Sequence, residues 1–150
     1  MENVNGISVE LSKEFNVAAS RLFQAWTQEE DLRQWWHPME NKLKSLVNEL
    51  QTGGRVEYSF ENSENKEVFT INGTYKEVEQ GKKLVYTWNW QLPTATIQDS
   101  EYLLTVQFES TGNGSRLNIT QENFANEEAV QPHREGWEKA LSELEGYLNK

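Results

Sequence analysis

The feature that most constrains the fold is a long series of segments in which apolar and polar residues alternate. These segments are 43–50, 55–61, 67–78, 82–91, 101–110 and 116–122, and turn-forming residues separate them. Alternation with a period of two is typical of β-strands that bury one face. No helical pattern lies between these segments, and short connections between strands predict an antiparallel sheet.

Helical patterns precede this series. A first strand is predicted over 6–14, followed by a helix over 17–26 that Asn16 would cap. A capping-box pattern at 27–30 predicts a second, shorter helix, which Pro38 should end.

After the strands the apolar period changes from two to that of a helix. The stripe consists of Trp137, Leu141, Leu144 and Leu148. Pro132 suits the first turn of this long C-terminal helix. Gly136 lies inside it, where glycine costs about 1 kcal/mol relative to alanine, so we expect close approach to the sheet or to a ligand. The whole order predicts an α+β fold with its helices on one face of the sheet.

One face of the predicted sheet is rich in aromatic side chains. The stretch VYTWNW (85–90) places Tyr86, Trp88 and Trp90 on one side, and the other strands add Tyr58, Phe60, Tyr102 and Phe108. The opposite face is polar, so the aromatic face should meet the C-terminal helix. These rings either form a solid core or line a cavity. Their hydroxyl and indole N–H groups need partners if buried, which favours a cavity.

The composition of the chain argues against several classes of function. The chain has no cysteine, which excludes disulfides and thiolate chemistry, and its net charge of -10 disfavours nucleic acids and anionic membrane surfaces. Its length of 150 residues predicts a single domain. The N-terminus lacks a signal-peptide pattern and no stretch is long and apolar enough to cross a membrane, so we expect a cytoplasmic protein.

The sequence offers little for catalysis or for cofactors. The chain has 2 histidines, far apart and without an ordered carboxylate cluster, which is a poor pattern for a metal site. No nucleophile signature is present, and no two carboxylates can be paired from sequence alone. The sequence therefore predicts no metal, no cofactor and no catalytic residue, and it favours a role other than that of an enzyme while leaving this open.

Several short motifs occur in an order that resembles a known family. They are Phe15 with Phe23-Gln-Ala-Trp26, Leu32 with Trp35-Trp36-His37-Pro38, Leu50-Gln-Thr-Gly-Gly-Arg55, Gly73-Thr-Tyr-Lys-Glu-Val78, Leu84-Val-Tyr-Thr-Trp88, and Gly136-Trp137 with Leu141 and Leu144. The pattern is similar to that of the START-related, birch-pollen-allergen-like superfamily, in the branch of the activator of the 90-kilodalton heat-shock protein ATPase. His37 stands where the branch has glycine in its Trp-Trp-Gly-Pro pattern, which places an ionisable group near the expected pocket mouth.

The resemblance implies a helix-grip fold, in which a curved antiparallel sheet wraps around the long C-terminal helix and encloses a cavity. It also implies binding of a small hydrophobic or aromatic molecule there. A chaperone-linked interaction module and a cavity-based hydrolase or cyclase are the alternatives, with a chaperone as the partner in the first of them. Whether the chain is a monomer or a homodimer stays open.

The candidate ligand-binding residues follow from the aromatic face, the Trp-Trp-His motif and the C-terminal helix. They are Trp35, Trp36, His37, Tyr58, Phe60, Tyr86, Trp88, Trp90, Tyr102, His133, Trp137 and Leu141. His133 lies one helical turn before Trp137, so both can face the sheet, with His133 as a hydrogen-bonding group or general base. The alternatives are a solvent-facing His133 and, for His37, an ordinary loop residue instead of a gate at the cavity mouth.

Overall fold

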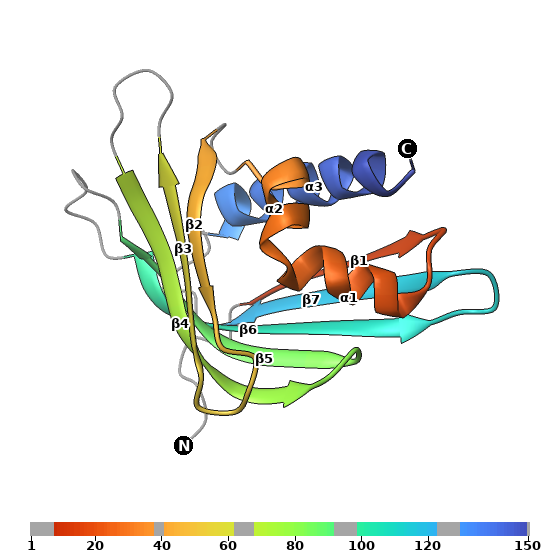
Figure 1. Ribbon diagram of the computed structural model, residues 1–150, viewed down its shortest axis with the longest axis horizontal. Coiled ribbons are helices and arrows are strands. Elements are labelled where there is room, and N and C mark those ends of the chain that lie inside the picture. The colour runs from red at the N-terminus through yellow and green to blue at the C-terminus, as the bar shows by residue number, and fades with distance from the viewer. Residues whose placement is uncertain (1–7, 38–40, 62–67, 92–98, 123–129, 150) are drawn as a thin grey trace.

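A computed structural model describes residues 8–37, 41–61, 68–91, 99–122 and 130–149 (Figure 1). Its elements, in chain order, are β1 (Ser8–Phe15), α1 (Ala19–Thr27), α2 (Glu29–Trp35), β2 (Lys42–Asn48), β3 (Arg55–Glu61), β4 (Val68–Glu79), β5 (Lys83–Gln91), β6 (Asp99–Ser110), β7 (Ser115–Glu122) and α3 (Val130–Leu148). This order confirms the one predicted from the periodicity of the sequence.

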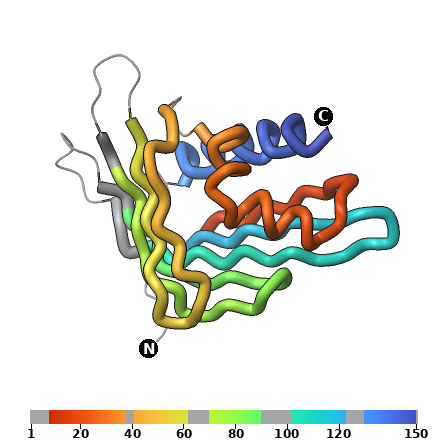
Figure 2. The backbone as a smooth tube through the Cα atoms, viewed as in Figure 1, coloured from red at the N-terminus to blue at the C-terminus, as the bar shows by residue number. Residues whose placement is uncertain are grey.

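The strands form one antiparallel sheet. It has 7 strands in the order β1-β7-β6-β5-β4-β3-β2, so β1 crosses over to pair with β7 at one edge. The tube in Figure 2 shows that β2, β3 and β4 stand at a steep angle to β6 and β7, which makes the sheet strongly curved. This is the α+β architecture with a curved sheet that the sequence predicts.

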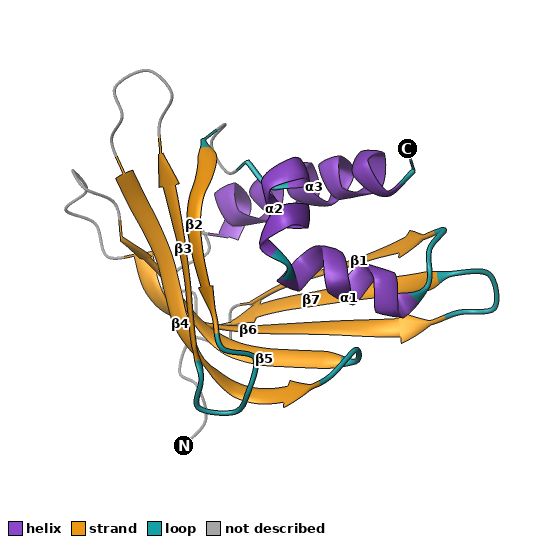
Figure 3. Ribbon diagram, viewed as in Figure 1, coloured by secondary structure: helices purple, strands orange, loops and turns teal. Residues whose placement is uncertain are grey.

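The helices lie in the concave side of the sheet (Figure 3). Within the described ranges no helix covers the convex side, where the outward residues of β3 and β5 are exposed or partly exposed. The backbone of α3 approaches mainly β1 and α2. Large side chains therefore fill the space between α3 and the central strands. The main pair is Trp88 on β5 and Trp137 on α3, whose ring centroids are 5.8 Å apart.

Gly73 marks a close approach between β4 and β5. A Cβ atom at this position would lie 1.8 Å from the carbonyl oxygen of Thr87. The next residue, Thr74, donates its backbone N–H to the Thr87 hydroxyl at 2.8 Å. The register of the two strands shifts slightly further on, between Tyr75 and Glu77. Glycine is therefore required at this close approach of β4 to β5.

The predicted helix caps are wrong. The residue before α1 is Ala18, not Asn16, and no side chain caps either α1 or α2. Thr27 is the last residue of α1 and donates its hydroxyl to the Phe23 carbonyl at 2.9 Å, and the residue before α2 is Gln28. The first turn of α2 contains Glu29, Glu30 and Asp31, whose negative charges favour a helix N-terminus without a cap.

The explanation expected for Gly136 is also wrong. No described atom lies within 4 Å of the place that a Cβ atom of Gly136 would occupy, and the residue is exposed on α3. Nothing in the described structure therefore requires glycine there.

Gly136→Ala is expected to stabilise the protein by about 1 kcal/mol, because alanine has the higher helix propensity and finds open space. Urea unfolding followed by circular dichroism measures this change. Gly146→Ala is the companion variant, since Gly146 lies on the same helix with equally open surroundings. A loss of stability in Gly136→Ala would show that a contact outside the described residues needs this glycine.

A polar network joins the three helices. Asp31 on α2 is largely buried and accepts hydrogen bonds from Arg21 of α1, at 3.0 Å, and from the hydroxyl of Tyr147 on α3. Burial alone would raise the pKa of Asp31, but the hydrogen bonds from Arg21 and Tyr147 and the charge of Arg21 outweigh it and lower the pKa. The charged form of Asp31 therefore stabilises the fold.

The stability that Asp31 contributes should depend on pH. A carboxyl whose pKa is lowered by folding stabilises the protein above its unfolded pKa, about 3.9, and loses this contribution as the pH falls through the folded value. We expect Asp31→Asn to cost about 1–2 kcal/mol at neutral pH and to cost progressively less as the pH falls below the unfolded pKa of about 3.9. Urea unfolding of both proteins across this range measures the difference, and a difference that does not change with pH would contradict the assignment.

Candidate functional site

Aromatic side chains from the sheet and from all three helices meet on the concave side. We call this the aromatic cluster; it consists of Trp26, Trp35, Trp36, Tyr58, Phe60, Tyr75, Tyr86, Trp88, Phe108 and Trp137, all of them buried. This confirms that the aromatic face of the sheet meets the C-terminal helix. The side chain of Trp90, which was predicted to join them, lies outside the described part of the structure.

Trp36 lies at the centre of one half of the cluster. Its ring meets Tyr58 and Phe60 edge to face, with centroids 4.8 and 5.2 Å apart, and stacks on Trp88 at 5.9 Å. These are the distances of rings in contact. Trp35 is anchored separately, because its indole N–H donates to the Ala25 carbonyl at 2.9 Å. At Trp35, Trp36, Tyr58 and Phe60 the rings therefore pack against each other, and a lining role for these four residues stays a prediction.

The phenol groups of the cluster are uncharged. Burial raises the pKa of Tyr86 to about 12, although the indole N–H of Trp26, which donates to its oxygen at 3.1 Å, acts in the opposite direction. Burial also raises the pKa of Tyr58 and of Tyr75, and the hydroxyl of Tyr75 donates to the Asn48 side chain at 2.6 Å. These phenols stay protonated at neutral pH, so they can form hydrogen bonds but cannot act as bases.

A group of polar side chains lies where the aromatic cluster meets the first half of α3. We call it the Gln121 cluster; it consists of Tyr102, Gln121, His133 and Trp137. Gln121 is 0% exposed and its carboxamide oxygen accepts the indole N–H of Trp137 at 2.8 Å. Its carboxamide nitrogen lies 3.3 Å from Nδ1 of His133, and the His133 ring lies 5.0 Å from that of Tyr102.

The hydrogen bonds of the Gln121 cluster determine one another. An indole N–H can only donate, so Trp137 fixes the Gln121 oxygen on its own side and turns the amide nitrogen toward His133. The amide nitrogen can only donate in its turn, so Nδ1 of His133 is the acceptor of this hydrogen bond. The His133 ring is thereby oriented with Nδ1 toward Gln121.

The local sequence explains how this cluster forms. On β7 every second residue is buried, and this row is Ser115, Leu117, Ile119 and Gln121. On α3 the spacing of four residues places His133 and Trp137 on the face toward Gln121 of β7, and the ligand-binding roles of this pair stay a prediction. Sequence reasoning missed Gln121, although the alternation that placed Ile119 inward also places Gln121 inward.

The remaining predicted site residues lie in different surroundings. His37 is partly buried just after α2, and its Nε2 atom lies 3.2 Å from the Arg33 carbonyl, so the imidazole satisfies a carbonyl at the end of that helix. Leu141 is buried on the inner face of α3. A gating role for His37 stays a prediction.

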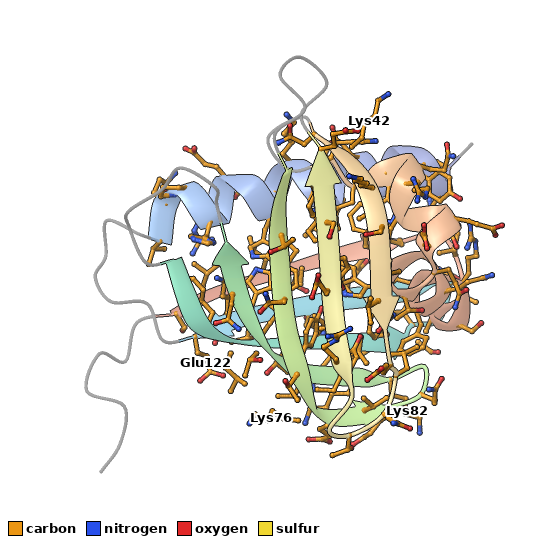
Figure 4. All side chains as sticks on the ribbon, turned by 60° about the vertical axis from the view of Figure 1, so that its left-hand side comes forward. Lys42, Lys76, Lys82 and Glu122 are labelled. Atoms are coloured by element: carbon orange, nitrogen blue, oxygen red, sulfur yellow. The ribbon has the colours of Figure 1, made fainter. Side chains whose placement is uncertain are left out.

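An open groove lies at the other end of the sheet. It has a volume of about 890 Å³ and is lined by residues 18–20, 79–83, 107–111 and Arg116. None of the predicted site residues lines it. In Figure 4, Lys82 at this groove and Glu122 next to Gln121 lie at separate ends of the molecule. The groove on the surface is thus separate from the buried Gln121 cluster.

The described residues contain neither a cluster suited to a metal ion nor a helix that could span a membrane. No group of three or more histidine, aspartate or glutamate side chains there could hold a metal ion. None of the described helices is both long enough and apolar enough to cross a bilayer.

The curved antiparallel sheet, the two short helices after β1 and the long helix against an aromatic interior define a helix-grip protein of the α+β class. The family described as "Activator of Hsp90 ATPase homolog 1-like protein" matches residues 16–149. The chain belongs to this family, as the resemblance in its motifs implies.

Solved structures support the fold at low sequence identity. The AHSA1 protein from Silicibacter pomeroyi is 23% identical with a TM-score of 0.79, and the match covers 95% of this chain and 98% of that one. A protein from Rhodobacter sphaeroides is 18% identical with a TM-score of 0.81, over 95% and 91% of the two chains. The AHSA1-like protein from Aeromonas hydrophila is 17% identical with a TM-score of 0.77, over 95% and 92%. No curated protein matches the chain.

Proposed function

We propose that this protein binds a small apolar or aromatic molecule between the sheet and the first half of α3, in contact with Trp88, Tyr102 and Trp137. The observation that carries the proposal is the Gln121 cluster. It places a fully buried carboxamide and an imidazole among side chains that are mostly apolar and aromatic.

This combination is typical of small-molecule sites, in which aromatic walls supply most of the contact and a few oriented polar groups supply specificity. Buried polar groups are costly for a core that only has to be stable, because apolar residues of the same size avoid the loss of hydration. The rings of Trp88 and Trp137 are 5.8 Å apart, and Tyr102 pairs with Trp88 across β5 and β6. The Gln121 cluster therefore continues directly into the aromatic cluster.

A titration with a panel of apolar and aromatic molecules tests the proposal. Tryptophan emission and native mass spectrometry report binding, and Tyr102→Leu should weaken it at least about fivefold because it removes one wall of the site. Phe108→Leu is the matched control. It is also a buried aromatic residue of β6, but it packs against Phe23 and Trp26 and not against the Gln121 cluster.

Binding that Tyr102→Leu weakens and Phe108→Leu leaves unchanged would support the site. If no member of a broad panel binds the folded protein, or if both variants weaken binding equally, the proposed site is wrong.

A chaperone-linked interaction is the second candidate, and the family match over residues 16–149 is the observation that favours it. The direct test is the ATPase rate of a purified 90-kilodalton heat-shock protein with and without this chain. An increase that saturates with concentration would support the interaction. An unchanged rate, together with no complex on gel filtration at low salt, would rule it out.

A further inference from the structure

Gln121 has hydrogen-bonding capacity that its described neighbours leave unused. A carboxamide offers two N–H groups and two lone pairs of its oxygen. Trp137 uses one lone pair and His133 uses one N–H, and no other partner of this side chain lies in the described part of the chain. Because Gln121 is 0% exposed, the second N–H is also shielded from bulk water.

Gln121 has one unused N–H and one unused lone pair on its oxygen. Leaving the N–H without a partner costs more free energy than leaving the lone pair unused. Buried N–H groups without an acceptor are rare in proteins, whereas carbonyl oxygens that use only one lone pair are more common. The carboxamide cannot exchange its oxygen and nitrogen to relieve this, because the Trp137 indole would then face an amide nitrogen that cannot accept. The unused N–H therefore stays on the same side of the Gln121 side chain.

We propose that Gln121 is the polar anchor of the ligand site and selects molecules that carry an oxygen acceptor, such as a carbonyl group, on an aromatic or apolar body. This inference rests on the proposed function and adds the chemical class of the ligand to it. The second N–H of Gln121 donates to the ligand oxygen, while Trp137 and His133 act as positioning residues that hold the carboxamide in one orientation.

The chemistry of the surrounding residues agrees with an uncharged acceptor. The described hydrogen-bond partners of Gln121 are the indole of Trp137 and the imidazole of His133, whose ring lies 5.0 Å from that of Tyr102, and its neighbours on the adjacent strands are Val9 and Leu104. These groups offer aromatic and apolar surfaces and no fixed charge, so a ketone, aldehyde or ester suits them better than an ion does.

Two molecules that differ in one group test this inference. Benzophenone and diphenylmethane have the same rings, but the first has a carbonyl where the second has a methylene. We expect benzophenone to bind about tenfold more tightly, which is the gain from one well-placed hydrogen bond. Isothermal titration calorimetry measures both affinities, and their ratio is the quantity to compare.

Gln121→Met should reduce this ratio to about one, because methionine has nearly the same length and no N–H. Gln107→Met, at an exposed position on β6, is the matched control and should keep the ratio of the original protein. If Gln121→Met does not fold, Trp137→Phe is the second variant. It removes the donor that orients the carboxamide and should lower the ratio while Gln121 stays in place.

The outcomes separate the inference from the proposed function. Equal affinities for the two molecules would overturn the inference and leave the proposed function standing. A ratio that persists in Gln121→Met would also overturn it, because another group would then bind the oxygen. If neither molecule binds the original protein, both the inference and the proposed site for such ligands fail.

Discussion

Trp36→Ala is expected to destabilise the protein by about 3–5 kcal/mol, the usual cost of removing a buried tryptophan. The Trp36 ring is 6% exposed and contacts three rings from β3 and β5 as well as that of Trp35. Its removal takes away a large side chain through which the end of α2 contacts β3 and β5, and the flat rings around it cannot close the space. The cost therefore includes the cavity that remains.

Urea unfolding measures the effect, with Trp36→Phe as the matched control. Phenylalanine keeps an aromatic ring at this position and should lose clearly less stability than alanine. A loss below about 1 kcal/mol in Trp36→Ala would mean that the ring contributes little to packing. In that case Trp36 would border open space, and the packed half of the aromatic cluster would have to be reassigned to the ligand site.

Gly73→Ala is expected to have the second largest effect, a destabilisation of about 1–3 kcal/mol or more. The added Cβ atom would lie 1.8 Å from the carbonyl oxygen of Thr87, and this oxygen belongs to the backbone of the neighbouring strand. A flexible side chain could move aside, but here β4 and β5 must separate. The separation would also break the hydrogen bond from Thr74 to the Thr87 hydroxyl.

Gly112→Ala is the control for this prediction. Gly112 lies in the exposed turn between β6 and β7, and no described atom lies within 4 Å of its Cβ position. Its stability should change by less than about 0.5 kcal/mol. Thermal unfolding compares the two variants, and equal stabilities would show that the sheet can bend at residue 73 without glycine.

The order of the elements could be predicted from the sequence because it depends on periodicity. Alternation in 55–61 and in 116–122 identifies strands whichever residues they pair with, and the spacing of Trp137 and Leu141 identifies a helix. Antiparallel pairing followed from short connections. The caps of α1 and α2 could not be predicted in the same way, because they depend on the residue at which each helix begins: α1 follows Ala18, and Thr27 belongs to α1 while Gln28 precedes α2.

The site was harder to predict because it depends on how side chains share space. The sequence grouped Trp36 and Trp88 correctly but could not show that their rings contact each other. Gln121 was overlooked because polar residues on strands were assigned to the outer face by residue type. Its place in the alternation of β7 was the available signal, and the donor on Trp137 that makes its burial possible lies 16 residues away.

The indole N–H resonances of the protein give the most direct test of ligand binding at Gln121. The chain has 6 tryptophans, and Trp137→Phe assigns the signal that belongs to residue 137. On addition of benzophenone we expect the Trp137 signal to shift, because its acceptor Gln121 gains a new partner. The Trp35 signal should stay in place, since its N–H is bound to the Ala25 carbonyl. A Trp137 signal that does not move at saturating ligand would contradict binding at this site.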